Sequence, residues 1–150
     1  MSRELKFRMW DKVNNKFINP FRFEWNDYYK NTGMVVLDFH GKIRIADYSS
    51  GNGDNSADSV YSEVDNPDNY VVQQYTGLND KNDNLIYEGD IVIDTQKQKY
   101  EIIFNENYAR YDLKIYSENK LTQSSYFTQM HNKKHIEVIG NIFEHLELLK

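Results

Sequence analysis

Residues 74–92 read QYTGLNDKNDNLIYEGDIV, and this stretch decides the fold. It combines turn residues, acidic side chains and β-forming residues more densely than any other part of the chain. Gly77 lets the chain leave a strand, and Gly89 allows a tight corner before the apolar residues 91–93, because glycine adopts positive φ without steric cost. We therefore interpret the stretch as the corner of a small β-barrel, with its acids pointing into solvent.

The same stretch contains the beginning of a calcium-loop pattern. Asp80, Asn82 and Asn84 fit the first, third and fifth positions of an EF-hand loop. The sixth position holds Leu85, where the sharp turn needs glycine, and the twelfth holds Ile91, where a bidentate glutamate is needed. The pattern favours a tight loop whose Asp and Asn side chains bond their own backbone.

Other catalytic and metal-binding patterns are also incomplete. Glu88 and Asp90 share a strand face, but Gly89 interrupts that strand and no base or nucleophile pattern joins them. His131 and His135 have a chelating spacing only on a helix, and the residues between them indicate a turn. The chain has no cysteine, which excludes disulfides and thiolate chemistry. We therefore predict no catalytic, cofactor-binding or metal-binding residue, and no enzymatic activity.

The whole chain is predicted to be mainly β. Aromatic residues make up 15% of it, while alanine is scarce, which suits pleated sheets better than helices. Residues 5–10 alternate as in a half-buried strand, and residues 34–39 and 42–47 flank the hairpin turn His40-Gly41. Short strands after residue 70, typical of a small barrel or sandwich, are expected near residues 70–75, 90–94, 99–105, 110–116, 124–130 and 136–143. A helix of two turns at most ends the chain, with Leu146 and Leu149 facing inward.

A change of composition divides the chain into three parts. Residues 47–69 carry six acids and no base, and they have almost no large apolar side chains. Such a segment buries too little surface to offset its conformational entropy, so we predict a flexible acidic connection with one helical turn near residues 56–64. The predicted organisation is an amino-terminal β subdomain at 1–46, this connection, and a barrel at 70–150.

The amino-terminal part is the basic part of an acidic protein. The net charge is −5, yet residues 1–46 hold nine basic and five acidic residues. Basic and aromatic residues interleave there, as on surfaces that bind single-stranded nucleic acid. The candidate binding face consists of Lys6, Arg8, Trp10, Arg22, Trp25 and Lys30. The alternative, which we favour, is an ordinary strand surface or a face for self-association.

Three motifs, in the same order along the chain, resemble the YopX family of phage and prophage proteins. They are KFRMWD at residues 6–11, the stretch at 74–92, and EVIGNIFEHLELL at 137–149. The sequence departs from the family pattern at Asn84, where glycine is common, and at residues 145–147, where the family has an asparagine-proline turn. The resemblance implies a carboxyl-terminal SH3-like β-barrel and a phage-borne gene of unassigned function, and it carries over no catalytic residues.

The motif residues are expected to serve the backbone and the fold. They are Gln74, Tyr75, Thr76, Gly77, Tyr87, Glu88, Gly89, Asp90, Gly140 and Asn141. We predict a non-enzymatic interaction or assembly module that forms homo-oligomers and binds a phage or host protein, with nucleic-acid binding as the alternative. No stretch approaches the ~20 apolar residues of a membrane span, so the expected location is the cytoplasm of the bacterial host, without a membrane partner.

Overall fold

The computed structural model describes residues 5–18, 34–37, 42–48, 59–63, 65–117, 120–126 and 135–149. The chain divides into two compact units. Met9–Val71 form one, here called the amino-terminal unit, and Met1–Arg8 with Val72–Lys150 form the other, here called the carboxyl-terminal unit. This division differs from the expected one because the first eight residues group with the carboxyl-terminal unit.

The described part of the chain is mainly β, as predicted, and antiparallel pairs join β1–β2, β3–β4, β4–β5, β6–β7, β8–β9, β9–β10, β10–β11 and β8–β12. The sheet orders are β2-β1-β6-β7, β11-β10-β9-β8-β12 and β3-β4-β5. The elements in chain order are β1 Phe7–Asp11, β2 Lys16–Ile18, β3 Met34–Leu37, β4 Ile43–Tyr48, β5 Ser59–Glu63, η2 Pro67–Asn69, β6 Tyr70–Asn79, β7 Leu85–Tyr87, β8 Asp90–Asp94, β9 Lys99–Asn105, β10 Arg110–Ser117, β11 Lys120–Tyr126, β12 Ile136–Asn141 and η4 Leu146–Leu149. No helix among these elements is long and apolar enough to cross a membrane.

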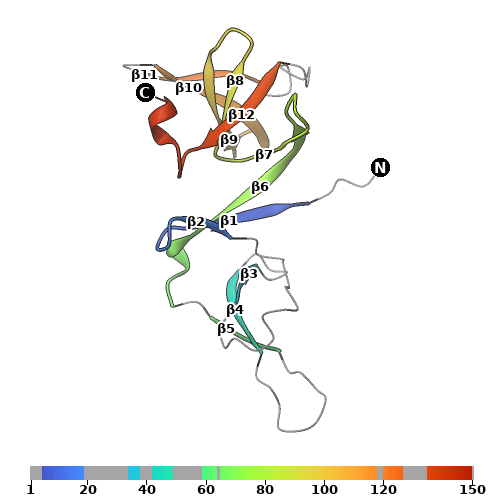
Figure 1. Cartoon of the computed structure of the whole chain (residues 1–150), viewed down its shortest axis with the longest axis vertical. Coiled ribbons are helices and arrows are strands. Elements are labelled where there is room, and N and C mark those ends of the chain that lie inside the picture. Colours follow the sequence, from blue (N-terminus) through green and yellow to red (C-terminus); the bar gives the residue numbers. More distant parts are fainter. Residues whose placement is uncertain are drawn as a thin grey trace. The chain divides into compact units, whose positions relative to one another are not determined.

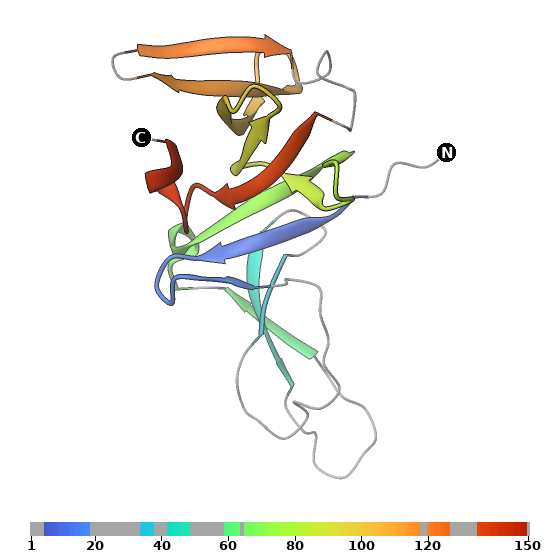
Figure 2. The same cartoon turned by 45° about the horizontal axis from the view of Figure 1, so that its top comes forward.

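The carboxyl-terminal unit is built on the five-stranded sheet, which curls into a half-barrel (Figures 1 and 2). Strands β8 and β9 have the predicted bounds. Strand β11 begins at Lys120, earlier than predicted, because Ser117 and Lys120 pair directly across the turn from β10. The short strand β7 was not predicted, and Leu146 is exposed rather than inward, whereas Leu149 is buried.

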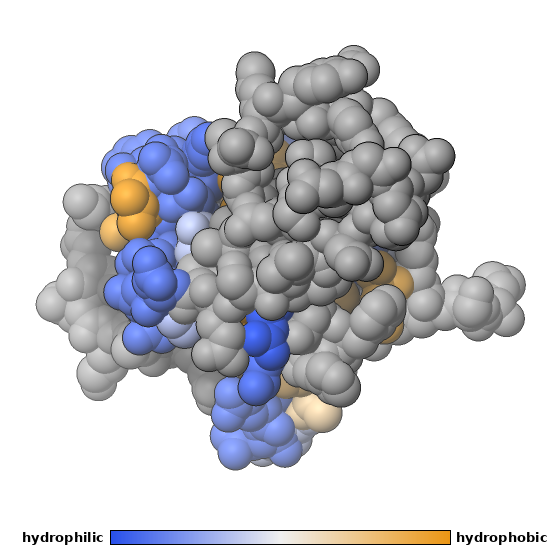
Figure 3. Space-filling view, turned by 90° about the horizontal axis from the view of Figure 1, so that it is seen from below, coloured by the Kyte–Doolittle hydropathy of each residue, from blue (hydrophilic) through white to orange (hydrophobic). Residues whose placement is uncertain are grey.

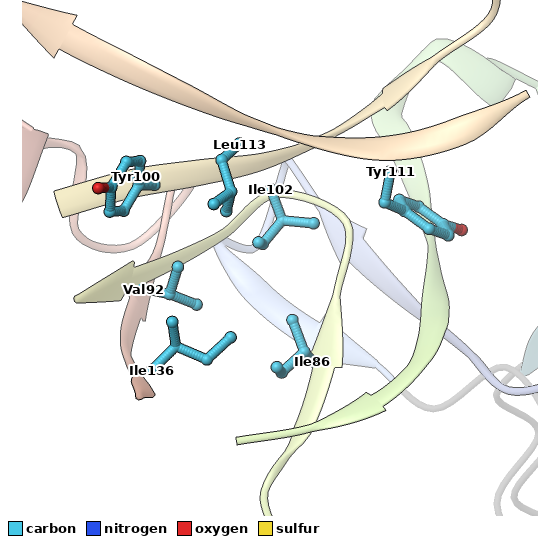
Figure 4. Packing of buried hydrophobic residues seen from close by; sticks show 7 residues of the cluster. All are labelled: Ile86, Val92, Tyr100, Ile102, Tyr111, Leu113 and Ile136. Carbon is cyan, nitrogen blue, oxygen red and sulfur yellow. The ribbon is translucent and has the colours of Figure 1, made fainter. Parts of the chain in front are cut away.

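One hydrophobic core fills the half-barrel. Its buried residues are Ile86, Val92, Tyr100, Ile102, Tyr111, Leu113 and Ile136. Alternate residues of β9 and β10 supply four of them, namely Tyr100, Ile102, Tyr111 and Leu113, and Tyr100 and Tyr111 lie at opposite ends of the cluster (Figure 4). The Tyr100 hydroxyl donates to Asp94 Oδ2 at 2.9 Å, and burial together with this carboxylate raises the pKa of Tyr100 to about 12. The Tyr100 hydroxyl can therefore lie beside the hydrophobic core because it has a hydrogen-bond partner.

The amino-terminal unit contains the hairpin of β1 and β2 and the three-stranded sheet β3-β4-β5. In the β1–β2 hairpin, Trp10 lies opposite Phe17, and their rings meet edge to face with centroids 4.9 Å apart. Strands β3 and β4 pair from Met34↔Ala46 to Leu37↔Ile43, as the hairpin pattern predicts. Its tip at residues 40–41 and the alternating segment at 21–25 lie outside the described residues.

The predicted helical turn near residues 56–64 is wrong. Residues 59–63 form β5, which pairs with β4 so that Glu63 lies opposite Arg44 and Val60 opposite Asp47. The acidic segment was expected to be flexible because it has few apolar side chains, yet the central strand β4 of the sheet supplies backbone partners for residues 59–63. Sheet formation here depends on that pairing rather than on local composition.

Candidate functional site

Four polar side chains from four strands meet at the turn Glu88-Gly89-Asp90, which we call the EGD corner. They are Arg8 of β1, Gln73 of β6, Asp90 of β8 and Asn141 of β12, and we call this set the polar centre. Asp90 belongs to the stretch at 74–92, and Gln73 directly precedes it. Arg8 and Asn141 come from the first and last sequence motifs. The three motifs therefore converge in space.

The polar centre is a continuous hydrogen-bond network. Arg8 forms an ion pair with Asp90 through Nη2 and Oδ1, and its Nε donates to Gln73 Oε1 at 2.8 Å. Asn141 Nδ2 lies 3.2 Å from both Gln73 Oε1 and Asp90 Oδ1. The backbone N–H of Tyr87 donates to Asp90 Oδ2 at 2.7 Å, and the Arg8 guanidinium carbon lies 4.5 Å from the centroid of the Tyr87 ring. Each acceptor oxygen of Gln73 and Asp90 thus has a donor.

The carboxylate at the middle of this network is removed from water. The side chain of Asp90 is 1% exposed and that of Arg8 is 23% exposed. Burial raises the pKa of Asp90, while Arg8 and the bonds from Tyr87 and Asn141 lower it. The expectation that this acid points into solvent is therefore wrong. A buried carboxylate depends on its partners, and here the main partner comes from the amino-terminal strand.

Gly89 allows the polar centre to assemble. Its φ is +76°, a conformation that side-chain-bearing residues rarely adopt, and this agrees with the corner interpretation. A Cβ at this position would lie 2.1 Å from Gln73 Nε2. The backbone of Gly89 also forms two hydrogen bonds. Its N–H donates to Ile102 O, and its carbonyl accepts from Ile142 N. The glycine is needed both for the turn and for the close approach of Gln73.

The loop between β6 and β7 is organised by Asp80, which is buried. Its Oδ1 accepts the backbone N–H groups of Asn82 and Asn84 at 2.8 and 2.9 Å. Its Oδ2 accepts Asn84 Nδ2 at 3.1 Å and the N–H of Val138 in β12 at 3.0 Å. The expected backbone bonding within the loop is confirmed. The bond to Val138, which fixes the loop to a distant strand, has no signal in the local sequence.

Changing Asp80 to asparagine is expected to lower the free energy of unfolding by about 2–3 kcal/mol at neutral pH, because an amide NH₂ then faces the Val138 N–H and leaves it unsatisfied. Burial alone raises the pKa of Asp80, but the four hydrogen bonds outweigh it and hold that pKa below 3.8. Stability from a lowered carboxyl pKa is present above 3.8 and is lost as the pH falls through the folded-state value. Urea denaturation at neutral pH and near pH 3 should therefore show a difference that shrinks in acid.

The matched control is Asp83→Asn in the same loop. Asp83 is exposed and has a φ of 63°, which asparagine tolerates. This control is expected to change the unfolding free energy by less than about 0.5 kcal/mol. Equal losses in the two variants would contradict the role assigned to Asp80.

Glu88 and Asp90 do not form a carboxylate pair. Glu88 is half-buried and its carboxylate accepts the backbone N–H of Phe104. Burial raises the pKa of Glu88, and the neighbouring carboxylate of Glu101 raises it further. Glu101 itself pairs with Lys114, with Nζ and Oε2 3.1 Å apart. The two acids of the EGD corner therefore have separate partners on separate strands.

The remaining motif residues also make contacts within the chain. The Gln74 carbonyl accepts from Glu88 N, and the Thr76 hydroxyl donates to Ile86 O at 2.9 Å. Gly77 has a φ of +89°. A Cβ at Gly140 would lie 2.9 Å from that of His145, so the imidazole side chain packs directly on this glycine. These contacts serve the strand ends around the polar centre.

The structure describes three of the six members of the candidate nucleic-acid face. Arg8 belongs to the polar centre, and Trp10 is 4% exposed. The Lys6 amine lies 5.7 Å from the centroid of the Tyr75 ring. Arg22, Trp25 and Lys30 lie outside the described residues. Met9, Trp10 and Asp11 are buried in succession, so both faces of β1 are covered at its carboxyl-terminal end.

Exposed aromatic side chains occur instead on the β9–β10 hairpin. Phe104 is 42% exposed and Tyr108 is 66% exposed. The Arg110 guanidinium carbon lies 4.5 Å from the centroid of the Tyr108 ring, and Phe104 packs on Tyr111 with centroids 5.3 Å apart. We call Phe104, Tyr108 and Arg110 the aromatic hairpin. No sequence pattern indicates this exposed pair, because Phe104 and Tyr108 resemble ordinary strand and turn residues.

Comparison with known proteins identifies the family. The family model described as YopX protein matches residues 6–150. The chain belongs to the YopX family, which confirms the resemblance seen in its three motifs. A comparison with curated proteins found no match.

Two solved structures are similar in fold. Protein EF1440 from Enterococcus faecalis has a TM-score of 0.56 and 24% sequence identity, and the match covers 99% of this chain and 100% of that chain. Protein yopX from Bacillus subtilis has a TM-score of 0.51 and 14% identity, with the same coverage. At these identities the likeness concerns the fold alone.

Proposed function

We propose that this chain is a phage or prophage accessory protein that acts by binding, without catalysis, as an interaction or assembly module in the cytoplasm of the bacterial host. We also propose that its curled five-stranded sheet is an SH3-like barrel. The aromatic hairpin carries the functional proposal. Exposed aromatic rings beside an arginine have the composition of protein interfaces, where Tyr, Phe and Arg are enriched.

The internal use of the motif side chains supports the same proposal. Among the described residues, every buried side-chain nitrogen or oxygen atom has a hydrogen-bond partner. The acids of the EGD corner are bonded to Arg8, to Tyr87 N and to Phe104 N, as expected for residues that hold a fold. Reactive groups in active sites are more often left available to a substrate.

The proposed module forms homo-oligomers through the aromatic hairpin. Light scattering and sedimentation velocity over a concentration series should show the average mass rising from that of one chain as the concentration increases. Tyr108→Ala is expected to weaken this association at least tenfold, since exposed tyrosines at interfaces commonly contribute more than about 1 kcal/mol each. Leu146→Ala, at another exposed apolar position, is the control and should leave the association unchanged. A wild-type chain that stays monomeric up to millimolar concentration would refute self-association.

A further inference from the structure

The exposed apolar residues of the described segments differ in their charged neighbours. Large exposed side chains are Leu5, Val13, Phe104, Tyr108 and Leu146. Val13 is 64% exposed and stands between Lys12 and Lys16, which are exposed too. The aromatic hairpin, in contrast, lies beside carboxylates. Val13 thus has positively charged neighbours, whereas the aromatic hairpin has negatively charged ones.

The carboxylates around the aromatic hairpin come from three positions. Glu106 is exposed in the turn between β9 and β10. Glu88 accepts the N–H of Phe104, and Asp112 accepts from Arg110 Nε at 2.8 Å. Asp112 is buried and neutralises Arg110, so the exposed Glu106 and the half-buried Glu88 leave the surroundings of the hairpin acidic. Aromatic faces next to carboxylates favour a cationic partner, through cation–π contact and Coulomb attraction.

The aromatic hairpin is held in one conformation before any partner binds. Asn105 Nδ2 donates to Asp112 Oδ2 at 2.7 Å, and Asn105 Oδ1 accepts from Asn107 N at 3.2 Å. The turn closes with the N–H of Tyr108 on the carbonyl of Asn105. A surface that is ordered in advance loses less conformational entropy on binding.

The turn between β1 and β2, residues 12–16, is held in a similar way, and we call it the basic turn. The buried Asp11 carboxylate accepts Val13 N at 2.9 Å, Asn14 N at 3.0 Å and Asn14 Nδ2 at 2.7 Å. Lys12 Nζ donates to the carbonyl of Asp68 at 2.7 Å. The turn therefore presents an apolar side chain between two ammonium groups on a fixed backbone.

We propose that the basic turn of one copy docks on the aromatic hairpin of a second copy. The inference rests on the proposed self-association and names its two surfaces. Val13 packs against the exposed aromatic rings, and Lys12 and Lys16 face the carboxylates of Glu106 and Glu88. Since the two surfaces differ, the contact is heterologous, so each copy keeps one free surface of each kind and the assembly grows into rings or open chains.

The proposed contact involves few side chains, namely Val13 and two lysines on one copy and two aromatic rings with their carboxylates on the other. On the face drawn in Figure 3, the coloured surface is mostly hydrophilic, and hydrophobic residues show as small separate patches. Interfaces of this kind belong to the weak, transient class. We therefore expect association that is detectable only at high protein concentration and that weakens as salt screens the charges.

The test uses two variants that each damage one surface. Tyr108→Ala damages the aromatic hairpin and keeps the basic turn, while the double change Lys12→Ala with Lys16→Ala damages the basic turn and keeps the hairpin. Each variant alone is expected to associate about tenfold more weakly than the wild type. An equimolar mixture of the two restores one intact contact, so sedimentation velocity should show dimers and no larger species.

Control measurements distinguish a lost contact from a misfolded variant, and the possible outcomes distinguish this contact from self-association in general. Circular dichroism and thermal melting confirm that each variant is folded, and Lys97→Ala, an exposed lysine of the β8–β9 turn, should leave association unchanged. If the wild type stays monomeric, both the proposed self-association and this contact fail. If the wild type associates but the basic-turn variant associates equally well, or the mixture forms no dimer, this contact fails while self-association stands.

Discussion

Replacing Arg8 with methionine is expected to lower the free energy of unfolding by about 3–5 kcal/mol at neutral pH, the usual loss when one partner of a buried ion pair is removed. Asp90 is 1% exposed, so its carboxylate cannot regain water when the guanidinium is gone. Methionine keeps most of the apolar stem and thus separates the loss of charge from the loss of packing. Urea denaturation followed by circular dichroism measures the difference.

The pH dependence of this loss has a definite sign. Burial raises the pKa of Asp90, and Arg8 opposes the rise, so removing Arg8 raises that pKa further. A carboxyl whose folded-state pKa lies above the unfolded value gives stability below the unfolded value, 3.8, and that stability is lost as the pH rises through the folded-state pKa. The difference between wild type and Arg8→Met should therefore shrink as the pH falls from neutral toward about 4.

Two further variants test the assignment to the ion pair. Adding Asp90→Asn to Arg8→Met removes the unpaired charge and should recover part of the lost stability. Lys6→Met removes a cation from the same segment, 5.7 Å from the Tyr75 ring, and is expected to cost less than about 1 kcal/mol. If Lys6→Met and Arg8→Met were equally destabilised, the buried pair would not be the cause.

Replacing Gly89 with alanine is the second change with a large expected effect, a loss of about 2–5 kcal/mol of unfolding free energy. Two costs combine. The φ of +76° is unfavourable for alanine, and its Cβ would lie 2.1 Å from Gln73 Nε2, so Gln73 must move. Movement of Gln73 in turn disturbs the bonds from Arg8 and Asn141.

Gly77→Ala separates the two costs. Gly77 also has a positive φ, +89°, but it is exposed, so alanine there pays mainly the backbone cost of about 1–2 kcal/mol. The excess loss in Gly89→Ala measures the collision with Gln73. Thermal or urea denaturation of both variants provides the comparison, and equal losses would show that Gln73 adapts freely.

Local pattern was sufficient for the strands that carry their own signals. Strands β8 and β9 are apolar or alternating runs bounded by turn residues, and both have the predicted bounds. Strand β5 could not be predicted, because Val60 and Tyr61 stand in a segment whose composition suggests flexibility and whose order comes from pairing with β4. Similarly, β7 contains only three residues, too few for a period to be recognised.

The polar centre was only partly accessible from the sequence. Gly89 could be assigned to a corner because the chemistry of glycine is local. The pairing of Arg8 with Asp90 could not be predicted, because the alternation places Arg8 on a solvent face. Nothing in the local sequence indicates that the end of β1 is buried on both sides. Likewise, Asp80 shows the pattern of a loop-forming aspartate, but its bond to Val138 depends on the position of β12.

The polar centre also constrains the order of events on the ribosome. Arg8 is synthesised long before Asn141, which belongs to β12 and donates to both Gln73 and Asp90. The nascent chain therefore holds the cationic side chain of Arg8 without its complete set of partners until β12 has been synthesised. Contacts between positions so far apart in the sequence slow folding, so the polar centre is expected to close late in the folding of the carboxyl-terminal unit.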